Sequence, residues 1–269
     1  MSMENTYEVK GFLSVFHPIP LGQKIGDCKM DFDQKRKKYF ISVIVSAETQ
    51  REAEQKGFIR FNQVLPVFCI HTGVSHKIGT ITVSQISGSK PHLHSSKIVL
   101  VRETHLPLTN EKIGEIENTL RILDKLPNEK RTTKIITRAI NYFLRGCYLE
   151  TQWRSESFLN FYKVTELIAQ DFRKDFSEEL RNQLKGTLLE KLTEIEREKL
   201  RTPKRLVQFM CLQLNIPIGD EISRIVALRP KFSAHATLKE VDVSSEEFNE
   251  CKAISGKVLI NYIHQQVHG

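Results

Sequence analysis

An arginine and a histidine near the end of the chain have the types and the spacing for phosphate chemistry. Arg229 and His235 lie six positions apart in the stretch ALRPKFSAHATL, residues 227–238. Arginine carries a permanent charge on a planar group that fits phosphate oxygens, and histidine exchanges a proton near neutral pH. Together they suffice for cleavage of RNA without a metal. Histidine takes the proton of a ribose 2′-hydroxyl, and arginine stabilises the charge that grows on the phosphate. On spacing alone, the same pair also suits a simpler role, that of capping and orienting a helix junction.

Glu166 is a candidate for supporting this pair. It lies four residues after Tyr162, at the edge of an apolar helical stripe. A partly buried carboxylate needs a cation, and Arg229 is one candidate partner. The alternative is an ordinary ion pair with Lys163 or Arg173.

Several further residues are candidates for contact with a phosphate or with RNA. Ser233 can hydrogen-bond a phosphate, or it can cap the helix that holds His235. Lys231 has the charge to steer a phosphate toward the pair. A longer basic set falls at helical spacing upstream and can guide RNA or form a solvated helix face; it consists of Arg131, Lys134, Arg138 and Arg145.

The elements that carry these residues are helical throughout residues 109–269. Thr109 and Asn110 can cap a first helix, which ends before Pro127 and Asn128. Later start signals are Thr202-Pro203 and the capping box formed by Ser244 and Glu247. The periodicity predicts an all-α bundle with helices at about 109–123, 130–150, 155–172, 177–200, from 203 onward, 220–228 and from 244 onward.

Residues 1–106 have a different pattern, which predicts a small α+β domain with an antiparallel sheet. Strand-like segments rich in β-branched and aromatic residues fall at 8–16, 39–46, 77–86 and 97–102, and a helix is expected over 47–68. We expect the domain boundary near residues 105–108. The first domain would sense a trigger or select a substrate. The fold class as a whole is therefore α+β.

Composition narrows the function classes. The chain has 269 residues, a net charge of +8 and five cysteines, an odd number with no CxxC pair. This argues against a disulfide framework and a structural zinc site and favours a cytoplasmic protein. No apolar run is long enough to span a membrane, and no signal peptide is recognisable. The run at residues 35–38 is expected to form a solvated loop.

The familiar phosphate-binding and catalytic motifs are missing. The sequence contains no GxxxxGK[ST], GxGxxG, HExxH or GxSxG. His92 and His94 are two positions apart and would share one face of a strand, which makes a metal site conceivable. Their serine- and lysine-rich surroundings instead favour a loop, so we expect no metal and no cofactor.

The second half resembles the HEPN domain, and within it the Apea-like branch. The resemblance is carried by three stretches: RAINYFLRGCYLE at 138–150, SFLNFYKVTELIAQDF at 157–172, and ALRPKFSAHATL before a long closing helix. The family signature is an Arg, four to six residues, then a His, which Arg229 and His235 match with five. The resemblance implies a metal-independent endoribonuclease whose composite site lies at a homodimer interface. It further implies a role in phage defence or as a toxin, with a neutralising or activating protein partner.

A non-catalytic role is the alternative, because other members of the HEPN family bind RNA or nucleotides without cutting them. The residue after the signature Arg is often polar in that family, and here it is Pro230. In this alternative, Arg229 and His235 hold a nucleotide, an RNA or a protein partner, or fix the helix junction.

Overall fold

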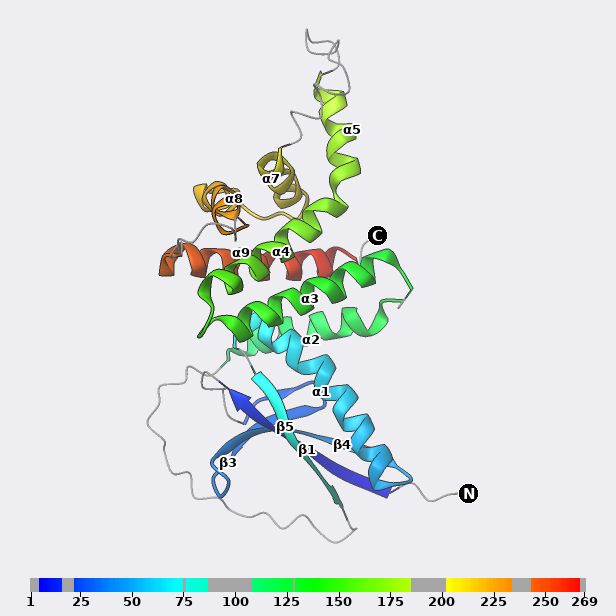
Figure 1. Ribbon diagram of the computed structural model, residues 1–269. Helices are drawn as coiled ribbons and strands as arrows, with labels where there is room; N and C mark the ends of the chain where they lie inside the picture. Colours follow the sequence, from blue (N-terminus) through cyan, green and yellow to red (C-terminus); the bar gives the residue numbers. More distant parts are fainter. Residues whose placement is uncertain are drawn as a thin grey trace. The chain divides into compact units, whose positions relative to one another are not determined.

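The computed structural model describes residues 5–15, 22–74, 76–86, 108–127, 129–184, 202–233 and 243–266. For residues 15, 76, 77, 184 and 229–233 it describes the backbone alone. The chain divides into two compact units, Met1–Arg121 and Ile122–Gly269. The first contains an antiparallel sheet and the second is helical, so the expected α+β class is confirmed (Figure 1).

The first unit is a five-stranded antiparallel sheet with one long helix packed against it. The strand order is β2-β3-β4-β1-β5. The strands are β1 Asn5–Val15, β2 Lys24–Ile25, β3 Cys28–Asp33, β4 Lys38–Ala47 and β5 His76–Gln85. Helix α1, Gln50–Thr72, contacts β1, β4 and β5. A close fit holds it there, because Gly57 packs directly on Val9 of β1.

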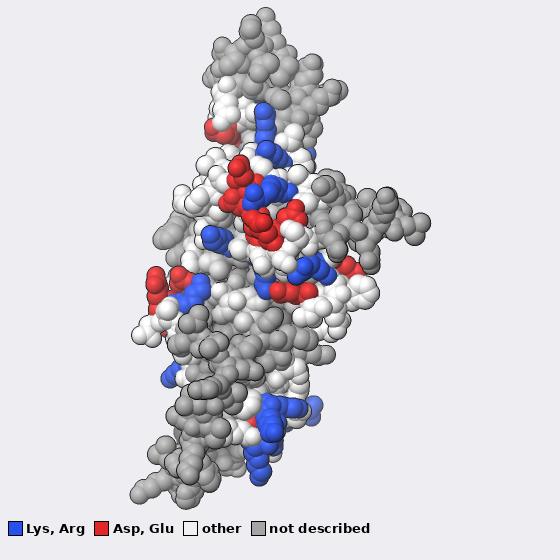
Figure 2. Space-filling view, turned by 90° about the vertical axis from the view of Figure 1, so that its left-hand side faces the viewer, with Lys and Arg blue, Asp and Glu red and all other residues white. Residues whose placement is uncertain are grey.

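The expected strands at 8–16, 39–46 and 77–86 and the helix at 47–68 are confirmed, with shifted ends. The expected strand at 97–102 lies outside the described residues, as do His92 and His94. The hairpin of β2 and β3 was not expected from the sequence. The basic run at 35–38 is confirmed as exposed and falls at the turn between β3 and β4. Figure 2 shows lysine and arginine side chains gathered at the lower end of this unit.

The boundary between the units differs from the expected position near residues 105–108. Helix α2 spans Asn110–Lys125, and its first three turns belong to the first unit. The Nε2 atom of His71 lies 2.9 Å from the hydroxyl oxygen of Thr119. Glu117 accepts a hydrogen bond of 2.9 Å from the backbone N–H of Gly26. These side chains tie the start of α2 to α1 and to the β2–β3 turn, which sequence periodicity does not reveal.

The second unit stacks helices in layers. Helices α4, Arg154–Asp171, and α9, Ser245–Gln265, form a central pair. On one side lies α3, Arg131–Leu149, and on the other lie α7, Pro203–Gln213, and α8, Asp220–Ser233 (Figure 1). Helix α5, Arg173–Leu184, follows α4 after a one-residue turn at Phe172 and contacts α7.

An aromatic cluster forms the centre of this unit. Phe161 of α4 meets Phe143 of α3 at a ring-centroid distance of 5.1 Å and Phe248 of α9 at 5.7 Å. Gly146 allows α3 to approach, because a Cβ atom there would lie 2.7 Å from the Phe161 ring. Ser157 donates a hydrogen bond to the Gly146 carbonyl at 2.6 Å. The three longest helices of the unit are thus fixed to one another.

Three expected caps are confirmed, and two expected starts are wrong. Thr109, Thr202 and Ser244 each accept a hydrogen bond from a backbone N–H three residues later. By contrast, α4 begins one residue before Ser155, and α5 begins at Arg173 instead of Ser177. The Ser177 hydroxyl donates to the Arg173 carbonyl, a bond that a serine inside a helix can make.

Candidate functional site

Arg229 lies on a helix that is longer than the sequence predicts. The expected helix end at Leu228 is wrong, because α8 continues to Ser233 with Arg229 and Pro230 in helical backbone. Pro230 has no N–H to donate to the carbonyl of Val226, and a proline inside a helix costs about 3 kcal/mol. The helix nevertheless continues one turn beyond its packed segment.

Helix α8 is anchored to α9 before it reaches Arg229. Ile222, Ile225 and Leu228 are buried on its packed face. Arg224 forms an ion pair with Glu250 of α9, and this carboxylate raises the pKa of Arg224. The backbone of Arg229 is therefore held by a packed helix and not by a loop.

The Arg229–His235 pair lies partly outside the described residues. The side chains at 229–233 are not described, which includes Lys231 and Ser233, and His235 lies outside the described residues. Glu166 is described and lies half-buried on α4, a helix that contacts α8. Its alternative partner Lys163 lies with Nζ 5.5 Å from the ring centroid of Tyr142. The pairing of Glu166 with Arg229 stays a prediction.

Arg138 and Arg145 occupy a different surface from α8. Both are exposed on α3. Because α4 and α9 lie between α3 and α8, the structure does not bring these arginines near Arg229 within one copy of the chain (Figure 1). The basic set of α3 is therefore a second candidate site.

The exposed face of α3 is strongly positive. Its residues recur at spacings of three and four, which places them within about 100° of the helix circumference. They are Arg131, Lys134, Arg138, Asn141, Arg145 and Tyr148, all exposed. The 19 residues of α3 include no aspartate and no glutamate. Among the described residues, no carboxylate lies within ion-pair distance of Lys134, Arg138 or Arg145. We refer to these six residues as the α3 face.

Arg131 at the start of the α3 face is neutralised locally. Its guanidinium lies 3.1 Å from Asp171 at the end of α4. Asp171 also accepts a hydrogen bond of 2.6 Å from the hydroxyl of Tyr262 on α9. Burial and the neighbouring Asp171 raise the pKa of Tyr262, so this hydroxyl keeps its proton. Arg131 therefore serves to join α3, α4 and α9.

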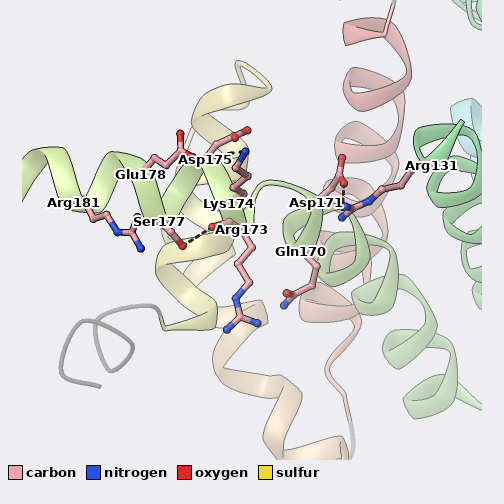
Figure 3. A pocket seen from close by; sticks show the side chains of 9 residues that line it. All are labelled: Arg131, Gln170, Asp171, Arg173, Lys174, Asp175, Ser177, Glu178 and Arg181. Atoms are coloured by element: carbon pink, nitrogen blue, oxygen red, sulfur yellow. Dashed lines mark hydrogen bonds and ion pairs between the residues drawn. The ribbon is translucent and has the colours of Figure 1, made fainter. Parts of the chain in front are cut away.

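An open groove of about 580 Å³ adjoins Arg131 at the junction of α4 and α5 (Figure 3). Its lining mixes both signs: Arg131, Gln170, Asp171, Arg173, Lys174, Asp175, Ser177, Glu178 and Arg181. Lys174 lies 3.9 Å from Glu178 in this lining. The three carboxylates offset most of the four cations, so the groove is a weaker anion site than the α3 face.

Two aromatic residues were not singled out from the sequence: Tyr148, the last residue of the α3 face, and Trp153, which follows it. Tyr148 is 50% exposed, and Trp153, in the turn before α4, is 59% exposed. The backbone N–H of Trp153 donates to the carbonyl of Leu149 at 2.8 Å, so Trp153 belongs to the turn that directly follows α3. The signal for Tyr148 was present, since it continues the basic spacing three residues after Arg145.

The described residues contain no candidate metal-binding site and no cysteine suited to act as a nucleophile. No group of three or more histidine, cysteine, aspartate or glutamate side chains is placed there to hold a metal ion. All five cysteines are buried, and none of them forms a disulfide. Burial raises the pKa of Cys28 to about 12 and that of Cys211 to about 11, so neither forms the thiolate that a nucleophile requires. In the same part of the chain, no helix is both long and apolar enough to cross a membrane.

The chain matches no protein-family model, no curated protein and no solved structure.

Proposed function

We propose that the protein is a metal-independent endoribonuclease of the HEPN type, with Arg229 and His235 as its catalytic residues. The observation that carries the proposal is the placement of Arg229. It follows the packed segment of α8, directly before the segment with His235 that leads to the closing helix α9. A helix anchored by Arg224 and Glu250 can hold an arginine where a phosphate needs it.

The reaction needs no group beyond the chain and the RNA. His235 removes the proton of a ribose 2′-hydroxyl, whose oxygen attacks the adjacent phosphorus. The bond from phosphorus to the 5′-oxygen breaks, and that oxygen takes a proton from a second acid. Arg229 stabilises the charge on the non-bridging oxygens. The products are a 2′,3′-cyclic phosphate and a 5′-hydroxyl.

In the homodimer that the HEPN resemblance implies, the second acid is the His235 side chain of the other copy. Glu166 and Ser233 would orient Arg229 and the phosphate, and Lys231 would steer RNA toward them. We place the protein in the cytoplasm, in phage defence or as a toxin, with a protein partner that activates or neutralises it.

The test is cleavage of total RNA in EDTA by the purified protein and by Arg229→Ala and His235→Ala. Circular dichroism and thermal melting first establish that all three fold equally. We expect RNA cleavage by the wild type alone. Equal cleavage by wild type and His235→Ala would contradict the assignment of His235. Lys204→Gln is a matched control, because it removes an exposed charge from α7 without touching α8.

A non-catalytic RNA-binding protein is the second candidate. It is favoured by the position of the α3 face, which lies across the α4–α9 layer from α8. RNA bound on that face does not need Arg229 or His235. This candidate predicts that wild type and His235→Ala bind RNA equally and that neither cuts it.

A further inference from the structure

We propose that the α3 face, together with Trp153, is a binding site for single-stranded nucleic acid. The phosphates lie on the cations of the helix, and the bases stack on the aromatic residues at its end. The α3 face lies across the α4–α9 layer from helix α8, and binding there is tested independently of the ribonuclease activity.

Uncompensated charge is the first argument. Helix α3 places Lys134, Arg138 and Arg145 on one exposed strip with no carboxylate in the helix to pair with them. Lys134 to Arg145 spans 11 residues, or about 17 Å of helix. A solvated helix face ordinarily alternates charges of both signs, because like charges at a spacing of three or four repel one another. A row of like charges is stabilised by a polyanion that lies along it.

Exposed aromatic surface is the second argument, and it favours single-stranded over double-stranded nucleic acid as the ligand. Tyr148 and Trp153 are 50% and 59% exposed, although large aromatic side chains are usually buried. Tyr148 lies on the α3 face three residues after Arg145, and Trp153 follows in the turn before α4. Both add exposed aromatic surface after the row of cations. Bases of a single strand can leave their neighbours and stack on such rings, whereas bases of a duplex are already stacked.

A site that contacts only phosphates and base faces should not distinguish RNA from single-stranded DNA. Phosphates and base faces are common to RNA and DNA, and no described residue on the α3 face requires the 2′-hydroxyl. Single-stranded DNA should therefore bind as RNA does. Since DNA lacks the 2′-hydroxyl nucleophile, it reports on this site while cleavage is impossible.

Trp153 provides a direct readout, because it is the only tryptophan in the chain. The experiment titrates the full-length protein with oligothymidine of about eight nucleotides and follows tryptophan fluorescence. We expect saturable quenching by the single strand and none by a duplex of the same length. Quenching that is equal with the duplex, or none with either, would overturn the proposal.

Three variants test the contribution of stacking. Tyr148→Ala should weaken oligothymidine binding about five-fold or more while Trp153 still reports it. Trp153→Phe keeps a ring and should retain binding when followed by fluorescence anisotropy of a labelled oligonucleotide. Phe58→Ala is the matched control, because Phe58 is 47% exposed on α1. An equal loss from Phe58→Ala and Tyr148→Ala would contradict the site. RNA cleavage without Trp153 quenching would refute this site and leave the ribonuclease intact.

Discussion

Removing two cations from the α3 face should change how its nucleic-acid affinity depends on salt. The variant is Arg138→Gln with Arg145→Gln, which deletes charge and keeps helix-forming side chains of similar length. Arg131 is paired with Asp171 at 3.1 Å, so three cations are left for phosphates: Lys134, Arg138 and Arg145.

The magnitude follows from counterion release. Each phosphate contact on a single strand changes log K by about −0.7 per tenfold rise in salt. The wild type should therefore have a slope of about −2.1 and the double variant about −0.7. With equal affinity at 1 M salt as the reference, the difference of about 1.4 predicts a loss in affinity of about 14-fold at 0.15 M salt and about 65-fold at 0.05 M.

The assay is fluorescence anisotropy with labelled oligothymidine at four or more salt concentrations. A variant with Lys204→Gln and Arg205→Gln is the control, since it makes the same change in net charge at exposed positions of α7. This control should keep the wild-type slope. The same slope for wild type and the Arg138/Arg145 variant, or the same change in both variants, would refute the reasoning, because binding would then depend on net charge alone.

Three further predictions concern stability and reactivity. Gly57→Ala should lower the free energy of unfolding by about 1–3 kcal/mol, because its Cβ would lie 2.5 Å from a methyl group of Val9; an unchanged urea midpoint would contradict this packing. Ser244→Ala removes the capping box that Ser244 forms with Glu247 and should cost about 1 kcal/mol in thermal unfolding; no loss would mean that the cap adds nothing. Burial raises the pKa of Cys28 to about 12 from an ordinary value near 9. The stabilisation that its neutral thiol provides is therefore complete below about pH 9 and is lost as the pH rises toward 12; alkylation of Cys28 in the folded protein at about pH 8 would contradict this.

Local signals in the sequence were sufficient to predict much of the fold. The caps at Thr202 and Ser244 were found because side-chain oxygens before a helix satisfy backbone N–H groups that have no partner within it. The change from strand to helix periodicity located the two kinds of unit. The β2–β3 hairpin was missed because a two-residue strand is too short to alternate.

Features that depend on packing were not predictable in the same way. Proline disfavours helical backbone at the residue before it, so Arg229 was expected to follow α8 and not to belong to it. The domain boundary depends on contacts of Glu117 and Thr119 with segments far away in the sequence. Trp153 resembles a core residue by type, and its exposure emerges only when the turn between α3 and α4 is built.

The candidate site was predictable in composition but not in arrangement. Arg138 and Arg145 were correctly expected on one helical face, since that follows from spacing. Spacing does not reveal that α4 and α9 separate this face from α8. The α3 face and the end of α8 are therefore two separate candidate sites.

The most direct measurement of the central claim is the chemistry of the cut ends. RNA and an oligonucleotide of the same sequence with every 2′-hydroxyl removed are incubated with the protein in EDTA, and the products are analysed by mass spectrometry. We expect only the RNA to be cut, to 2′,3′-cyclic phosphate and 5′-hydroxyl ends, and His235→Ala to yield neither. Cleavage of the deoxy substrate, or RNA products with 3′-hydroxyl ends, would contradict it.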